Sequence, residues 1–308
     1  MKYVFVCGLH RSGTTLLAQK VGKLKDCAAF ENTGVLMDEG QFLQDVYPIE
    51  TVYGGVGKFG FSTQAHLTED SPLLTPTNVS RLRQSWEVYW DRSKSIRVEK
   101  TPSNLLKTRF LQAAFPNAYF IVIKRHPVPV SLASQKWSQT PLHNLFEHWL
   151  RCHEIFDEDK KRLTRLYEIS YGDFAKNPKK HLAEIANFIG TEFSDSLGGE
   201  VAEDYDQQYF DQWDQMLRSS RLKSYYRCVA RMYEERFRTH GYSLAPLSFE
   251  PAFSLNGDKP TLRPLFYLGA DICCVLWRAE TRLRDASRPA RHLCGRKVRS
   301  ILHNLTVR

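Results

Sequence analysis

Two glycines near the amino terminus, Gly8 and Gly13, bracket the residues whose types and spacing point most clearly to chemistry. An apolar run at residues 3–6, typical of a buried parallel strand, precedes them, and an apolar periodic segment that predicts a helix follows. A tight loop between a strand and a helix binds phosphate, because free backbone N–H groups and the helix dipole converge on one anion. The side chains expected to add contacts to this phosphate are His10, Arg11, Ser12, Thr14 and Thr15.

This glycine loop, residues 8–13, departs from the loop of nucleoside triphosphatases. Gly8 and Gly13 have the spacing of G-x-x-x-x-G-K-[ST], but Thr14 stands where that pattern has lysine. The lysine normally reaches the β- and γ-phosphates, so its absence argues against hydrolysis of ATP or GTP. Here the cation is Arg11, within the loop itself. We therefore expect a nucleotide with a single 5′ phosphate and a different transferable group.

A second cation follows the clearest central strand in the sequence, residues 118–124. Arg125 comes directly after this strand, and a guanidinium there can bind a second phosphate through two parallel hydrogen bonds. Ser131 or Ser134, in the helix expected at 128–138, can add a hydroxyl. Chemistry in open parallel sheets lies at the carboxyl ends of strands, so Arg125 should share an edge with the glycine loop. Two anion sites on one edge indicate a bisphosphorylated nucleotide.

Two carboxylates and a lysine are further candidates for this edge. A short predicted strand at 96–100 ends in Glu99 and Lys100, which the same rule places beside the glycine loop. Glu39 falls one loop after the phosphate-binding helix. The alternative interpretation of Glu99 and Lys100 is a surface ion pair at a strand end, which is common and weak.

Strand and helix patterns alternate along the chain, which predicts an α/β fold with a P-loop-like parallel sheet flanked by helices on both faces. Segment 48–75 is rich in Gly, Pro, Ser and Thr, and is interpreted either as a flexible substrate lid or as a poorly ordered insertion. His143, His148 and His153 recur every five residues, so they do not share one helix face and are expected in packing and surface roles. The later helices are expected at 77–93, 142–166, 178–190 and 221–240.

The composition is that of an ordinary globular protein, with 42% hydrophobic and 25% charged residues among 308. The seven cysteines include no C-x-x-C pair, which predicts neither a zinc site nor a disulfide framework. A reducing, cytoplasmic compartment is the simpler expectation. The sequence starts directly with a strand pattern and contains no apolar run of bilayer length, so we expect neither a signal peptide nor a membrane span.

The net charge of +9 is concentrated in the last part of the chain. Residues 257–308 hold eleven Lys or Arg and four Asp or Glu, so residues 1–256 are nearly neutral. We expect a main domain at 1–256, a basic helical extension at 257–308, and no general affinity for nucleic acid. The extension is interpreted either as a helix docked on the main domain or as a peripheral contact with a membrane or polyanion.

Three motifs, in this order, resemble the sulfotransferase superfamily, whose members use 3′-phosphoadenosine-5′-phosphosulfate (PAPS). GLHRSGTT at 8–15 resembles the family's 5′-phosphosulfate loop, in which a cation at the position of Arg11 contacts the transferring group. VIKRHP at 122–127 resembles the 3′-phosphate motif. Residues 167–174, followed by Asn-Pro, resemble the next strand and turn, where an aromatic at the position of Tyr171 approaches the adenine. The resemblance covers about residues 3–195.

One departure concerns the serine of the 3′-phosphate motif, which in the family usually lies eight residues after the arginine. That position here is Ala133. Ser131 and Ser134 flank it, and either is a candidate to replace the family serine.

The resemblance implies PAPS as co-substrate, no metal, and in-line transfer of a sulfuryl group to a hydroxyl or amine. The expected acceptor is a carbohydrate or a small metabolite. Arg11 and Lys100 would stabilise oxygens of the transferring group. Some family members place the catalytic base at the end of the strand that here carries Glu99, and others place it after the first helix, where Glu39 stands. Both carboxylates are therefore candidate bases.

Two other functions are compatible with parts of the sequence. A P-loop kinase of a small molecule would share the glycine loop, but Thr14 in place of lysine and the lack of a magnesium-carboxylate signature argue against it. A non-catalytic nucleotide-binding protein on the same fold is the other alternative. The joint presence of both carboxylates, Arg11 and Lys100 argues against that function.

Overall fold

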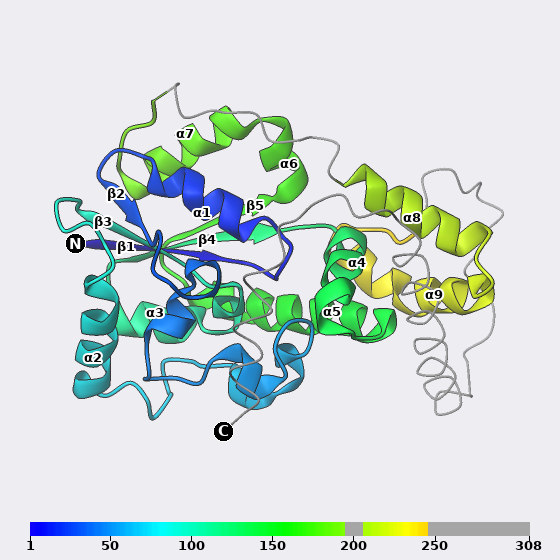
Figure 1. Cartoon of the computed structure of the whole chain (residues 1–308), viewed down its shortest axis with the longest axis horizontal. Coiled ribbons are helices and arrows are strands. Elements are labelled where there is room, and N and C mark those ends of the chain that lie inside the picture. Colours follow the sequence, from blue (N-terminus) through cyan, green and yellow to red (C-terminus); the bar gives the residue numbers. More distant parts are fainter. Residues whose placement is uncertain (195–205, 246–308) are drawn as a thin grey trace. The chain divides into compact units, whose positions relative to one another are not determined.

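The computed structural model describes residues 1–194 and 206–245. Its centre is a five-stranded sheet in the order β2-β3-β1-β4-β5, and every pair of neighbouring strands is parallel (Figure 1). The predicted α/β fold with a P-loop-like parallel sheet is confirmed. The strands are β1 (Lys2–Cys7), β2 (Cys27–Ala29), β3 (Ile96–Lys100), β4 (Ala118–Lys124) and β5 (Leu166–Ser170).

The register of the strands brings the predicted site residues to one edge. Val6 at the end of β1 pairs with Lys100 on β3 and with Ile121 on β4. The glycine loop after β1, the Glu99–Lys100 pair on β3 and Arg125 after β4 therefore leave the sheet on the same side. A parallel sheet places ligand-binding groups at this edge.

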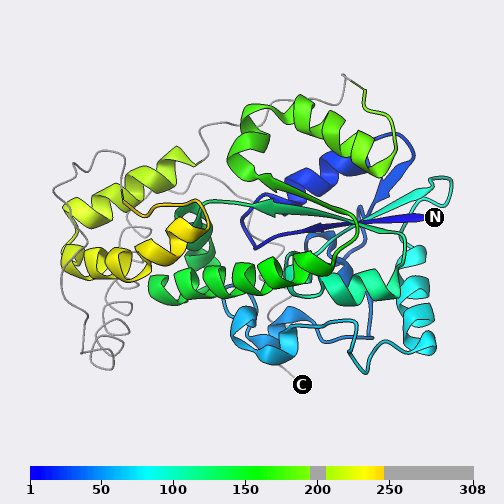
Figure 2. The same ribbon diagram turned by 180° about the vertical axis from the view of Figure 1, so that it is seen from behind.

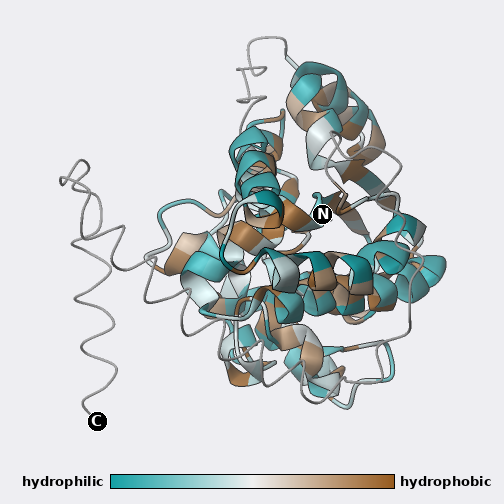
Figure 3. Ribbon diagram, turned by 90° about the vertical axis from the view of Figure 1, so that its right-hand side faces the viewer, coloured by the Kyte–Doolittle hydropathy of each residue, from teal (hydrophilic) through white to brown (hydrophobic). Residues whose placement is uncertain are grey.

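Helices cover both faces of the sheet, as the alternating pattern predicts (Figures 1 and 2). On one face lie α1 (Thr14–Gly22), α6 (Tyr171–Lys176) and α7 (Pro178–Ile189). The opposite face carries α2 (Pro76–Glu87), α3 (Thr108–Ala114) and α5 (Leu142–Asp159). The remaining helices, α4 (Pro127–Ser138), α8 (Gln207–Arg218) and α9 (Lys223–Thr239), lie beyond the carboxyl ends of the strands. Hydrophilic and hydrophobic residues alternate along the helices (Figure 3), and α7 buries only apolar residues, Leu182, Ile185, Ala186 and Ile189, as an amphipathic covering helix does.

Several element boundaries differ from those expected. The helix expected at 77–93 ends at Glu87, and the one expected at 142–166 ends at Asp159 with a short 3₁₀ helix, Lys160–Arg162, after it. A helix, α6, begins at Tyr171, where the sequence pattern indicated only a turn. Ser170 caps that helix by accepting a hydrogen bond from the N–H of Asp173, at 3.0 Å.

Segment 48–75 is packed against the protein rather than loosely exposed. It folds into three short 3₁₀ helices, Glu50–Tyr53, Phe59–Phe61 and Thr63–Ala65. The side chain of Phe59 is fully buried, and its ring contacts that of His148 on α5 with centroids 4.6 Å apart. Gly60 lies so close to α5 that an added Cβ would be 2.4 Å from the sulfur of Cys152. The part of the segment around Phe59 and Gly60 is therefore packed against α5, while many of its other residues are exposed.

The three histidines of α5 are all buried, so the expected packing role is confirmed and the expected surface role is wrong. Burial lowers the pKa of His148 to about 3 and holds that of His153 well below its ordinary value. Both imidazoles are therefore neutral packing groups at physiological pH.

Among the described helices, none combines the length and the apolar character needed to cross a membrane. The basic extension expected at 257–308 lies outside the described residues.

Candidate active site

The glycine loop is shaped by close contacts that exclude side chains at both of its glycines. Gly8 has a positive φ of 154°, and a Cβ there would lie 2.4 Å from the carbonyl oxygen of Ile123 on β4. Gly13 is the N-cap of α1 with φ 94°, and a Cβ there would lie 2.7 Å from the ring of Tyr171. The loop is thus pressed between β4 and α6, so the amino terminus of α1 faces the carboxyl edge of the sheet.

The loop has the donors that a phosphate-binding loop needs. The first four N–H groups of a helix have no acceptor within that helix. Ser12 is fully buried, and within the described residues its hydroxyl has no hydrogen-bond partner. A buried polar atom without a partner is costly unless a ligand or water satisfies it. These groups are what an anion at the amino terminus of α1 would bind.

Arg125 joins the end of β4 to this loop. Its guanidinium is 3% exposed, and Nη1 donates a hydrogen bond to the backbone carbonyl of Arg11. The guanidinium also lies over the ring of Tyr171, 4.3 Å from the centroid. The structure therefore brings three predicted nucleotide-binding residues, Arg11, Arg125 and Tyr171, together at one edge.

Asp206 is an additional partner of Arg125 that the sequence did not indicate. Its Oδ1 accepts hydrogen bonds from Nε of Arg125, at 2.7 Å, and from Nη2. In the sequence, Asp206 precedes a helix pattern, so the only local signal is that of an N-cap residue.

Glu39 and Lys100 form a buried ion pair beside α1. Nζ of Lys100 donates to Oε1 of Glu39 at 3.1 Å and to the carbonyl of Met37 at 2.9 Å. Nε2 of Gln41 donates to the other carboxylate oxygen at 2.7 Å. Lys100 also lines a small cavity whose other walls include Thr15, at the start of α1. The pair therefore lies on the α1 side of the sheet, as does the amino terminus of α1.

Glu99 points to the other face, because successive side chains of a strand alternate. It is buried, and its carboxylate accepts hydrogen bonds from the N–H of Gly40 at 3.0 Å, the hydroxyl of Thr101 at 2.6 Å and the amide of Asn104 at 2.7 Å. A Cβ on Gly40 would lie 2.5 Å from this carboxylate. Burial raises the pKa of Glu99 to about 7. Its contacts make Glu99 an anchor for the segment that carries Glu39.

His10 is held by a carboxylate that sequence reasoning missed. Its Nε2 lies 2.9 Å from Oε1 of Glu50, in the first 3₁₀ helix of segment 48–75. Burial alone would raise the pKa of Glu50, but the charge and hydrogen bond of His10 lower it below its ordinary value. His10, Glu39 and Glu50 each have one nitrogen or oxygen that could ligate a metal ion, and these three atoms lie within 4.8 Å of one another. Lys100 already supplies positive charge to Glu39 in this cluster.

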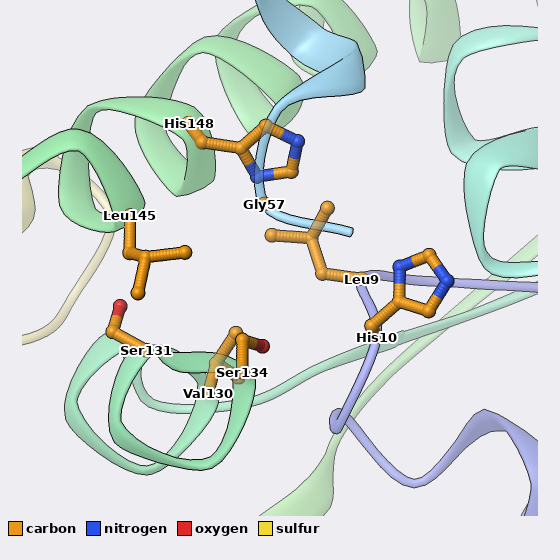
Figure 4. Close-up of a pocket in the computed structure, with 8 residues that line it drawn as sticks. All are labelled: Leu9, His10, Gly57, Val130, Ser131, Ser134, Leu145 and His148. Atoms are coloured by element: carbon orange, nitrogen blue, oxygen red, sulfur yellow. The ribbon is translucent and has the colours of Figure 1, made fainter. Parts of the chain in front are cut away.

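Ser131 and Ser134 line a pocket beside the glycine loop, as Figure 4 shows. Both are buried, and within the described residues the hydroxyl of Ser131 has no partner. Their side chains come from the side of α4 that faces this pocket, whereas Arg125 contacts Tyr171 and Arg11. The role of either serine toward a second phosphate stays a prediction. The residues that complete the lining are Leu9, His10, Gly57, Val130, Leu145 and His148.

A parallel sheet, a glycine loop at a helix amino terminus and a buried arginine on the next strand define a nucleotide-binding α/β protein of the P-loop-like class. The chain belongs to the sulfotransferase family, whose family model matches residues 4–195. The resemblance predicted from the three motifs is confirmed. No curated protein matches the chain in sequence.

Solved structures of sulfotransferases resemble the chain at low identity. The sulfotransferase domain of the curacin biosynthetic pathway is 15% identical, over 79% of this chain and 99% of that chain, with a TM-score of 0.43. The sulfotransferase domain of the Synechococcus PCC 7002 olefin synthase is 18% identical, over 64% of this chain and 76% of that chain, with a TM-score of 0.42. Sulfotransferase STF9 from Mycobacterium avium is 13% identical, over 79% of this chain and 77% of that chain, with a TM-score of 0.46.

The raised pKa of Glu99 predicts a measurable effect of pH on stability. Its ordinary value of 4.5 applies to the unfolded chain, and about 7 applies to the folded protein. The stability that Glu99 contributes is therefore fully present below pH 4.5 and is lost as pH rises through 7. Relative to Glu99→Gln, which does not titrate, the wild-type protein should lose up to about 3 kcal/mol of unfolding free energy across this range.

Urea unfolding followed by circular dichroism from pH 4.5 to 8 would measure this difference. The matched control is Glu158→Gln, on the exposed surface of α5, which should follow the wild-type curve. A constant difference between wild type and Glu99→Gln at every pH would contradict the assignment of Glu99 as a carboxylate destabilised by burial.

Proposed function

We propose that the protein transfers a sulfuryl group from PAPS to a hydroxyl, or an amine, of a carbohydrate or small metabolite. The observation that carries the proposal is the junction of the glycine loop, Arg125 and Tyr171 at one sheet edge. A 5′ phosphosulfate, a 3′ phosphate and an adenine ring need an anion loop, a second cation and an aromatic surface close together. Family membership supports the same reaction.

The residues present fit such a nucleotide. The unpartnered hydroxyl of Ser12 and the first-turn N–H groups of α1, which starts with Thr14 and Thr15, would hold the 5′ phosphosulfate. Arg125 would hold the 3′ phosphate, since a buried guanidinium binds oxyanions through two parallel bonds. The ring of Tyr171 would contact the adenine, next to the positions of both phosphates.

Sulfuryl transfer forms a bond from the acceptor oxygen to sulfur and breaks the bond from sulfur to the phosphate oxygen, releasing 3′-phosphoadenosine-5′-phosphate (PAP). Charge is spread over the sulfuryl oxygens and the leaving oxygen, so positioned cations lower the barrier. Arg11 lies in the loop, and its exposed side chain would contact the transferring group. The backbone carbonyl of Arg11 accepts a hydrogen bond from Arg125. Lys100 lines the cavity beside α1 and can reach the same oxygens.

The proton of the acceptor hydroxyl goes to Glu39 in this mechanism. Glu39 is paired with Lys100 on the loop side of the sheet. Glu99 lies on the opposite face, where its carboxylate accepts three hydrogen bonds. Nζ of Lys100 and Nε2 of Gln41 each donate to one oxygen of the Glu39 carboxylate, and so hold this candidate base in one orientation. His10 and Glu50 close the other side of this cluster. Glu99 acts by holding the backbone next to Glu39.

The pocket of Figure 4 lies next to His10, but its space is that of about one water molecule, which is too small for an acceptor. Its lining combines the side chains of Ser131, Ser134 and two histidines with the apolar side chains of Leu9, Val130 and Leu145.

Binding of PAP tests the nucleotide assignment without knowledge of the acceptor. Isothermal titration calorimetry should give an affinity for PAP at least about tenfold higher than for 5′-AMP, because the 3′ phosphate adds charge-assisted hydrogen bonds. ATP with Mg²⁺ should bind more weakly than PAP. Preference for ATP with Mg²⁺ would contradict the proposal and favour a kinase.

Replacing the two carboxylates separately tests the assignment of the base. Glu39→Gln should lower the turnover number by about 10²- to 10⁴-fold, the usual contribution of a general base, while PAP affinity stays nearly unchanged. Glu99→Gln should retain more activity than Glu39→Gln. The measurement is transfer of radiolabelled sulfate from PAPS to a panel of sugars and phenols. Full activity in Glu39→Gln would exclude Glu39 as the base.

A further inference from the structure

The partner of Arg125 stands where a phosphate would bind. Nε and Nη2 form one edge of the guanidinium, and both donate to Oδ1 of Asp206. This edge is the one that binds carboxylate or phosphate through parallel hydrogen bonds. Nη1 is directed to the carbonyl of Arg11, and the flat face lies over Tyr171. A phosphate that reached the Nε–Nη2 edge would therefore meet the carboxylate of Asp206.

Asp206 stands at the start of a helix that packs against the rest of the protein. It is the N-cap residue of α8, and Tyr209 in the first turn of that helix is 4% exposed. Lys136 on α4 lies 5.5 Å from the Tyr209 ring centroid, and His126 contacts the ring of Phe210 at 4.8 Å. The Asp206–Arg125 pair is therefore a partly buried, oriented contact, with Arg125 buried and Asp206 19% exposed, unlike a fully exposed ion pair that contributes little.

The carboxylate of Asp206 does not cap the helix that it precedes. An aspartate at the N-cap normally accepts a hydrogen bond from an N–H of the first helical turn. Here the side chain makes no capping bond to α8 and is turned to Arg125 instead. The backbone of Asp206 is helical, with φ −83° and ψ −29°, whereas a capping residue is usually extended, so its carboxylate does not cap α8 in this structure.

We propose that Asp206 competes with the nucleotide's 3′ phosphate for Arg125. The inference rests on the proposed function and adds a residue that sets specificity at the same site. Two anions cannot share one guanidinium edge, so Asp206 must leave before the phosphate binds. Its presence lowers the affinity for bisphosphorylated nucleotides and leaves that for 5′-monophosphates unchanged. Displacement of Asp206 also ties nucleotide binding to the position of α8.

Calorimetry on full-length protein tests this competition with PAP and 5′-AMP as probes. Asp206→Asn keeps the size of the side chain and removes its charge. PAP should bind about tenfold more tightly to this variant than to wild type, the scale of one charge-assisted hydrogen bond. The affinity for 5′-AMP should stay within about twofold. Asp206→Ser, which retains a capping group, should behave in the same way, with folding checked by circular dichroism.

Asp211→Asn is the matched control, because it removes the same charge from the exposed side of α8, where Asp211 contacts Gln207. PAP should bind to this control as it does to wild type. Equal or weaker PAP binding by Asp206→Asn would overturn the competition while leaving the proposed function intact. An equal gain for PAP and 5′-AMP would also overturn it, since the effect would then be general charge. Absence of PAP binding in wild type and both Asp206 variants would overturn the proposed function as well.

Discussion

The site depends on one buried carboxylate that performs no chemistry in this account. Glu99 accepts hydrogen bonds from Gly40, Thr101 and Asn104, and so fixes the chain that crosses the carboxyl end of β3. Only glycine fits at position 40, because a Cβ would enter the space of the carboxylate. This contact places Glu39 on the opposite face, against Lys100. A strand end with alternating side chains thus separates an anchoring carboxylate from the proposed base.

A second constraint joins the nucleotide-binding elements. The glycine loop is wedged against β4 and Tyr171, and Arg125 holds its backbone at Arg11. A loop fixed in this way needs little rearrangement to receive an anion, and preorganised donors are the main means by which an enzyme stabilises developing charge. The same arginine is held by Asp206 of α8. Arg125 therefore links the loop, the predicted adenine position and the helices beyond the sheet.

The sequence predicted the parts of the site that depend on local pattern. A strand, a loop with two glycines and a helix are specified within a few residues, and parallel order then brings Arg125 and Lys100 to the same edge. The choice between Glu39 and Glu99 was not predictable, because it depends on a 3₁₀ segment whose path is set by tertiary hydrogen bonds. Glu50 and Asp206 gave no functional signal, since their partners His10 and Arg125 are distant in the chain. Segment 48–75 has a loop composition, but Phe59 within it is fully buried against α5, a contact that depends on tertiary packing.

The most direct test of the central claim is a crystal structure of the protein with PAP. We expect the 5′ phosphate against the first turn of α1, the 3′ phosphate on Arg125, and the adenine beside Tyr171. Glu39 and Lys100 should face the 5′ phosphate, while Glu99 keeps its three hydrogen bonds on the other side of the sheet. A nucleotide bound away from the glycine loop, or Glu99 facing the 5′ phosphate in place of Glu39, would contradict the account.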